Sequence, residues 1–156
     1  MTTRADLQAR VQQARERFDA AAAAMDPASL ETQAICGVWT ARDVAGHVAD
    51  WNGELLAAAE YGLGRLSEAP PQIEDGEAYN ASHAEARKSQ SWAAAKADLD
   101  ASLERAAALL EDVDDEQLAS AAPFPWGGEG QVGEVIADAM AHVDEHVVDL
   151  ENNAQS

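Results

Sequence analysis

Three histidines in this chain have the type and spacing needed to bind one metal ion. His142 and His146 are four residues apart near the C-terminus, and His47 lies far earlier in the sequence. Four residues of an α-helix span about one turn, a rise of roughly 6 Å, so both side chains of the pair can point to the same ion. A third imidazole from a neighbouring helix would complete a facial set of three nitrogen ligands. Such a set leaves coordination positions open, as in a reactive metal centre.

The pattern of apolar residues places the three histidines on the inner faces of helices. His47 belongs to a stripe of residues at spacings of three and four that runs from Val44 to Leu55. His142 and His146 lie on or beside a similar stripe in the last predicted helix. Burial of an imidazole without a partner costs free energy, and a shared metal ion would supply a partner to each ring. The spacing alone also allows each to be an ordinary core histidine.

Helix start and stop signals divide the chain into four long helices and a broken middle region. Thr40 and Asp43 have the spacing of a capping box, with Asp in place of Glu, and predict the start of the second helix. Pro27 ends the first helix, and Gly62 marks the end of the second. The expected helices span about Arg4–Met25, Thr40–Gly62 with its cap, Glu77–Lys88, Trp92–Leu110 and Val132–Glu151, with a short turn at Asp114–Leu118 and loops between them.

The composition favours an all-α fold. Hydrophobic residues make up 47% of the chain, but many of them are alanine and only 5% of the chain is aromatic. Alanine has the highest helix propensity, and the alanine-rich stretches contain almost no β-branched runs. The 156 residues suffice for a proper core, so we expect a single domain over 1–156. Four long helices predict a four-helix bundle, whose core is a common place for metal sites.

The charge and the lack of targeting signals narrow the partners that we expect. The formal net charge is −19, which would repel a phosphate backbone and an anionic membrane surface, so we expect neither nucleic acid nor a membrane as partner. The start of the chain has no signal-peptide pattern, and no apolar run is long enough to span a bilayer. We therefore expect a cytoplasmic protein. A lone cysteine, Cys36, forms no internal disulfide and is expected to be a small buried residue.

Two segments resemble the signature helices of the DinB-like superfamily. The first, residues 37–51 (GVWTARDVAGHVADW), has a Trp, a Thr cap, an Asp three residues later, and His47 four residues after the Asp. The second, residues 133–146 (GEVIADAMAHVDEH), ends in the H-x-x-x-H pair. Both segments occur in the family's order and separation. Related members include the mycothiol-dependent maleylpyruvate isomerases and the bacillithiol transferases.

The resemblance implies an up-down-down-up four-helix bundle that holds a divalent metal, often zinc or nickel, through His47, His142 and His146. It also implies a small-molecule substrate and a low-molecular-weight thiol cosubstrate such as mycothiol or bacillithiol. Asn80 falls where several relatives carry an Asn near the start of the third helix, which suggests a polar pocket residue. Dimerisation through the outer faces of the bundle is common in the family and suggests a homodimer here.

Several other residues are candidates for a site around the metal. Glu145 and Asp50 are the nearest acidic residues in sequence and could transfer a proton or orient an imidazole; both could equally belong to solvated helix faces. Trp51 and Trp126 could line a substrate pocket, although a core role for Trp51 and a loop-anchoring role for Trp126 are also consistent with the sequence. His83 matches no ligand position of the family and is expected on the surface.

Three functions are compatible with these residues. The first is a metal-dependent thiol S-transferase or isomerase that acts on small electrophiles, with a metal that lowers the pKa of the bound thiol. The second is a non-catalytic metal-binding or ligand-binding bundle involved in stress or detoxification. The third is a metal-dependent hydrolase, in which water takes the place of the thiol. Three imidazoles suit zinc, nickel, copper or iron, so the ligand set alone does not name the metal.

Overall fold

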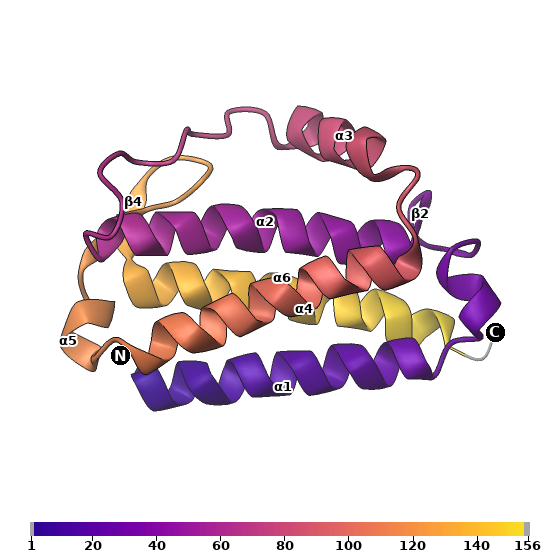
Figure 1. The fold of residues 1–156 in the computed structure, drawn as a ribbon, viewed down its shortest axis with the longest axis horizontal. Coiled ribbons are helices and arrows are strands. Elements are labelled where there is room, and N and C mark those ends of the chain that lie inside the picture. Colours follow the sequence, from indigo (N-terminus) through magenta and orange to yellow (C-terminus); the bar gives the residue numbers. More distant parts are fainter. Residues whose placement is uncertain (1, 155–156) are drawn as a thin grey trace.

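The computed structural model describes residues 2–154, and its architecture is an all-α bundle of four long helices (Figure 1). α1 and α6 run in one direction, and α2 and α4 run in the other, which gives the up-down-down-up order implied by the resemblance to the DinB-like superfamily. α2 packs on both α4 and α6, and α1 packs on the same two helices, so α1 and α2 lie at opposite corners. The four helices are α1 (Arg4–Ala23), α2 (Ala41–Gly62), α4 (Trp92–Glu111) and α6 (Val132–Asn153).

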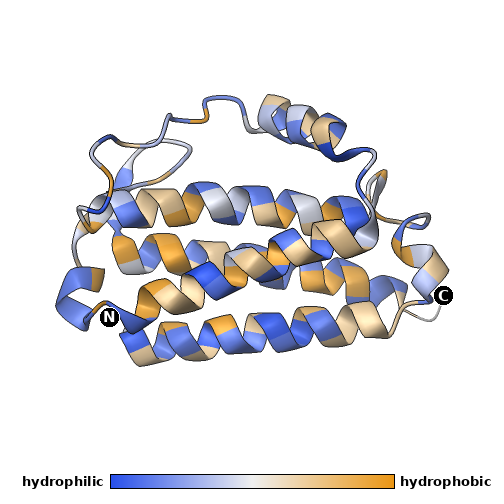
Figure 2. Ribbon diagram, viewed as in Figure 1, coloured by the Kyte–Doolittle hydropathy of each residue, from blue (hydrophilic) through white to orange (hydrophobic). Residues whose placement is uncertain are grey.

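The predicted apolar stripes form the core of the bundle. Figure 2 shows hydrophilic residues along the outward side of α1 and recurrent hydrophobic residues along α6. Each fully buried Leu, Ile or Phe side chain contributes about 1.5–3 kcal/mol relative to exposure, so these stripes hold the helices together. The residues of the α1 and α6 stripes that are buried are Leu7, Val11, Ala14, Phe18, Ala21, Val132, Val135, Ile136, Ala139, Val143, Val147 and Leu150. No helix within residues 2–154 combines the length and the apolar character needed to cross a membrane.

The start of α2 confirms the predicted capping box. The Asp43 amide donates to Thr40 Oγ1 at 3.3 Å, and the Thr40 amide donates to Asp43 Oδ2 at 3.0 Å. Two amides that have no partner inside the helix are thereby satisfied, which defines where α2 begins. This start also sets the rotation of α2, because every later residue of the helix follows at a fixed angle from it.

Two short hairpins occupy segments that the sequence predicted as loops. Their strands are at most three residues long, too short to show the alternation of a strand pattern. Gly37 joins the first pair at a φ of 58°, and Gly127 and Gly128 lie in the second turn at 108° and 84°. Positive φ favours glycine, so these turns depend on the residue type. The smaller elements are η1 (Pro27–Leu30), β1 (Ala34–Cys36), β2 (Trp39–Thr40), α3 (Gly76–Arg87), α5 (Asp115–Leu118), β3 (Ala121–Pro123) and β4 (Glu129–Gln131).

The connection from α2 to α4 crosses the length of the bundle, because both helices run in the same direction. Residues 63–91 make this crossing and carry α3, which lies against α2 on the outside of the bundle (Figure 1). None of the α3 residues is buried. Apolar burial therefore contributes little to the position of α3, and polar contacts have to hold it.

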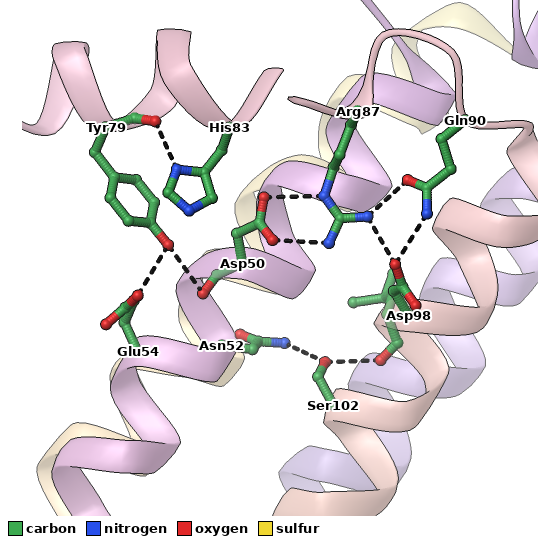
Figure 3. A network of polar contacts seen from close by, with 10 residues as sticks. Asp50, Asn52, Glu54, Tyr79, His83, Arg87, Gln90, Asp98 and Ser102 are labelled. Carbon is green, nitrogen blue, oxygen red and sulfur yellow. Dashed lines mark hydrogen bonds and ion pairs between the residues drawn. The ribbon is translucent and has the colours of Figure 1, made fainter. Parts of the chain in front are cut away.

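One polar side chain lies inside the bundle between α2 and α4. Asn52 is 0% exposed; its amide donates to Ser102 Oγ at 3.0 Å, while its buried Oδ1 has no partner in the described part of the chain (Figure 3). An unpaired buried acceptor costs about 1–3 kcal/mol, which exceeds the net gain of one neutral hydrogen bond.

We therefore predict that Asn52→Leu, which has a similar volume, raises the free energy of unfolding by about 1 kcal/mol. Urea unfolding followed by circular dichroism measures the change. Ser102→Ala serves as the matched control, because it removes the partner of Asn52 and the hydrogen bond from Ser102 Oγ to the Leu99 carbonyl, and should lower stability. Equal destabilisation by both variants would contradict the prediction.

Candidate metal centre and pocket

The three histidines of the two motifs meet at one point between α2 and α6. His142 Nε2 lies 3.0 Å from His47 Nε2 and 3.2 Å from His146 Nε2. All three side chains are half-buried, and they form one of the groups whose ligand atoms lie close enough to hold a metal ion. The four-residue spacing on α6 and the register of α2 against α6 therefore bring together rings that are distant in sequence.

The spacing of the three nitrogens fits a metal ion held by all of them. Zinc lies about 2.0–2.1 Å from an imidazole nitrogen, so nitrogens around one ion are about 2.9 Å apart at right angles and about 3.3 Å apart at tetrahedral angles. The observed 3.0 and 3.2 Å fall between these values. The three histidines would hold such an ion with three ligands, and two of them, His47 and His142, line the pocket described below.

The protonation of the rings also favours a cation between them. Burial, together with the two other imidazoles, lowers the pKa of His47 to about 3, and burial with His146 lowers the pKa of His142 to about 4. Both rings are therefore neutral at pH 7. His142 Nε2 faces two other Nε2 atoms and carries at most one proton, so it cannot satisfy both as a donor. A shared metal ion would accept a lone pair from each ring.

A carboxylate on α6 orients the third ring. Asp149 Oδ2 lies 2.9 Å from His146 Nδ1, which places the proton on Nδ1 and leaves Nε2 free to bind a metal. The sequence analysis did not select Asp149; its position three residues after His146 is the signal that could have indicated it. Cys36 is half-buried beside the same carboxylate, and burial together with Asp149 raises the pKa of its thiol. Cys36 is therefore a protonated thiol at neutral pH rather than a nucleophile.

A pocket of about 440 Å³ opens beside the histidines. Its α2 wall consists of His47, Trp51 and Leu55, and its α6 wall consists of residues that lie about one or two helical turns from one another. Asn80 from α3 and Trp126 from the β3–β4 turn complete it. The α6 wall consists of Asp138, Ala141, His142 and Glu145.

The structure brings most of the predicted site residues to this pocket. Trp51, Asn80, Trp126 and Glu145 all line it. Trp51 Nε1 donates to Asn80 Oδ1 at 2.7 Å, which connects α2 to α3 at the pocket wall. Asp138 also lines the pocket, and the sequence analysis missed it although it lies four residues before His142 on α6.

Asp50, the other predicted acidic residue, does not line this pocket. Its two carboxylate oxygens accept from Arg87 Nε at 3.0 Å and from Arg87 Nη2 at 2.7 Å (Figure 3). The same guanidinium donates to Asp98 of α4 at 2.8 Å. Arg87 thus joins the end of α3 to both α2 and α4, and pairing with Asp50 raises its pKa. The carboxylate of Asp50 therefore helps to hold α3 on the bundle through its pair with Arg87.

Further polar contacts hold the middle of α3 on α2. Tyr79 Oη lies 3.2 Å from Glu54 Oε1, and burial raises the pKa of this phenol, so it donates the hydrogen bond. His83, expected on the surface, is half-buried: its ring stacks on Tyr79 at 3.8 Å between centroids, apart from the three-histidine group. Gly46 leaves room for Arg87, because a Cβ there would come within 2.5 Å of Arg87 Cδ.

The fold and the histidine group define a four-helix bundle with a candidate metal centre at the wall of a pocket. The family model described as the DinB superfamily matches residues 10–149. The chain therefore belongs to the DinB superfamily, as its two signature segments suggested.

Solved structures share this fold. The crystal structure of the mycothiol-dependent maleylpyruvate isomerase matches with a TM-score of 0.75 and 19% sequence identity, over 96% of this chain and 63% of that protein. A mutant of the same enzyme, in which a histidine is replaced by alanine, matches with a TM-score of 0.74 and the same identity and coverage. This chain thus spans less than two thirds of the length of that enzyme. No curated protein matches the sequence.

The contacts of Arg87 predict how α3 responds to its loss. In Arg87→Gln, α3 loses its pair with Asp50 and Asp98, and a partly buried pair of this kind is worth roughly 1–2 kcal/mol. Because α3 contributes nothing to the core, we expect about tenfold faster proteolysis within residues 63–91, with little change in the thermal midpoint of the bundle. Lys88→Gln, which removes only an exposed pair with Glu85, should leave the cleavage rate unchanged.

The contact between Asp149 and His146 predicts a change in metal affinity. Asp149→Asn removes the negative charge behind the ring and should weaken zinc or nickel binding by about 10–100-fold, as measured by competition with a chromophoric chelator. Asp144→Asn on the same helix removes only an exposed pair with Arg17, and its affinity should equal that of the wild type. Equal affinities in all three proteins would exclude an orienting role for Asp149.

Proposed function

We propose that this protein is a metal-dependent thiol S-transferase or isomerase that acts on small electrophiles. The observation that carries the proposal is the convergence of three imidazole nitrogens, with His142 Nε2 at 3.0 and 3.2 Å from the other two, beside a pocket of about 440 Å³ that His47 and His142 line. The pocket has room for a small molecule beside the open side of the metal position. Membership of the DinB superfamily and the shared fold of a mycothiol-dependent isomerase support the use of a low-molecular-weight thiol.

His47, His142 and His146 would hold the metal, with zinc or nickel as the proposed ion. A divalent ion in this position lowers the pKa of a bound thiol or water and so supplies a nucleophile near neutral pH. Asp149 accepts a hydrogen bond from His146 Nδ1, and in this tautomer of the neutral ring the lone pair of Nε2 is available to the metal. The low pKa values of His47 and His142 have the same effect, because neither ring competes with the metal by binding a proton.

The remaining pocket residues would bind the substrate and move its proton. Glu145 lies one turn of α6 from Ala141 and three residues from His142, and its exposed carboxylate lines the pocket. We assign to it the proton released when a thiol enters the site. Trp51 and Trp126 supply flat apolar walls for the electrophile. Asp50 has no part in this scheme, since Arg87 occupies its carboxylate.

Metal analysis of tag-free protein and a thiol-dependence assay test the proposal together. We expect about one zinc or nickel ion per chain, and a more than roughly tenfold loss of affinity in each of His47→Ala, His142→Ala and His146→Ala, because each removes a ligand. His83→Ala is the matched control and should retain the metal. Unchanged occupancy in His47→Ala would contradict the three-histidine site.

The assay follows consumption of 1-chloro-2,4-dinitrobenzene by metal-loaded protein with mycothiol, bacillithiol, cysteine or no thiol. Turnover that requires one of the thiols supports the transferase. Equal turnover without a thiol would contradict it and indicate metal-dependent hydrolysis instead. No turnover of this electrophile with any of the thiols or without one would favour a non-catalytic metal-binding or ligand-binding bundle.

A further inference from the structure

The pocket walls beyond the three histidines are acidic and aromatic. Asp138 and Glu145 place carboxylates along α6, and Trp51 and Trp126 place indoles across from α6. No lysine or arginine is among the described residues that line the pocket. This combination is unusual for a site that would bind a carboxylate or a phosphate, because nothing on the protein side would offset a negative ligand outside the metal position.

The two carboxylates are available to a ligand. Within residues 2–154, neither Asp138 nor Glu145 has a hydrogen bond or an ion pair with another residue. Burial and the neighbouring Glu134 raise the pKa of Asp138, and Arg10 opposes this effect only in part. A cation in the pocket would relieve this negative potential, whereas an anion would add to it.

The two indoles are held in place by their own contacts. Trp126 is 49% exposed, yet its ring stacks on Phe124 at 5.2 Å between centroids and an angle of 10°. Trp51 is held by its hydrogen bond to Asn80, and its ring lies 6.5 Å from that of Trp126. Indole faces attract a cation within about 6 Å of their centroid, most strongly when it is shielded from water. Rigid rings beside free carboxylates are typical of a site for an organic ammonium group.

The hydrogen bond of Trp51 also decides which atom Asn80 presents to the pocket. An indole N–H only donates, so the Asn80 atom that it contacts has to be the carbonyl oxygen. The Asn80 NH₂ group has no partner in the described chain and can donate to a hydroxyl or carbonyl oxygen of a ligand.

From these walls we infer that the pocket binds a small organic molecule that carries an ammonium group, with the ammonium between the α6 carboxylates and the indoles, and that it discriminates against carboxylates. The inference rests on the proposed function only for the reaction that this molecule undergoes. The charge preference comes from Asp138, Glu145, Trp51 and Trp126, none of which is a proposed metal ligand.

The test compares three probes of one scaffold with the metal-loaded full chain. Benzyltrimethylammonium is the cation and has no lone pair for a metal, 2-phenylethanol is the neutral analogue, and phenylacetate is the anion. Tryptophan fluorescence and isothermal titration calorimetry measure the affinities. We expect benzyltrimethylammonium to bind about tenfold more tightly than 2-phenylethanol. Equal affinities, or tighter binding of phenylacetate to both the metal-loaded and the chelator-treated protein, would overturn the inference.

A double variant and a matched control locate the effect. Asp138→Asn combined with Glu145→Gln should reduce the preference for benzyltrimethylammonium to less than about threefold, because only the cation–π attraction remains. Glu104→Gln with Glu111→Gln makes the same change of net charge on the exposed side of α4 and should keep the full preference. An equal loss in both double variants would assign the preference to the overall charge of −19 and overturn the inference.

The outcomes of this test and of the thiol assay are separate. A preference for the ammonium probe without thiol-dependent turnover would support the inferred ligand class and contradict the proposed transferase activity. Thiol-dependent turnover without a preference for the ammonium probe would support the proposed reaction and contradict the inferred ligand class.

Discussion

The packing of α2 against α6 is the contact on which the candidate site depends. These helices run antiparallel; α2 contributes His47 and α6 contributes the other two imidazoles, and His142 Nε2 lies 3.0 Å from His47 Nε2 and 3.2 Å from His146 Nε2. A shift of one turn along either helix would move the rings by about 5.4 Å and separate them. The apolar stripes above and below the histidines oppose such a shift, because buried side chains in a packed core interdigitate. Core packing thus sets the precision of the polar site.

Much of this arrangement could be predicted from the sequence. The long helices, the Thr40 cap and the apolar stripes follow from local patterns, and the two signature segments identified the family. The partners of Asp50 and His83 could not be predicted, since they depend on where the crossing segment places α3. Asp138 and Asp149 were missed for a related reason: an acidic residue on a strongly acidic chain stands out only after the neighbouring helix shows which side faces the pocket. The hairpins were too short to leave a pattern.

The shared fold and the particular chemistry of this chain have different origins. At 19% identity, the likeness to the mycothiol-dependent isomerase shows the fold, and 63% coverage of that enzyme leaves part of it without a counterpart here. The three histidines lie half-buried between α2 and α6. The pocket beside them is lined by residues of α2 and α6, by Asn80 of the crossing segment and by Trp126 of the β3–β4 turn. The crossing segment and the β3–β4 turn can therefore change the pocket without changing the packing of the four long helices.

The absence of a side chain at Gly46 determines how α3 is attached to the bundle. A glycine inside a helix costs about 1 kcal/mol relative to alanine, and here that cost makes room for the side chain that fastens α3. The crossing segment therefore has its own point of attachment, independent of the hydrophobic interior. Apart from Leu63, which packs against the core, and the residues that contact α2, substitutions in residues 63–91 should therefore change the stability of the bundle little. For protein engineering, this segment is one in which the sequence beside the pocket can be varied at low risk to the packing of the four long helices.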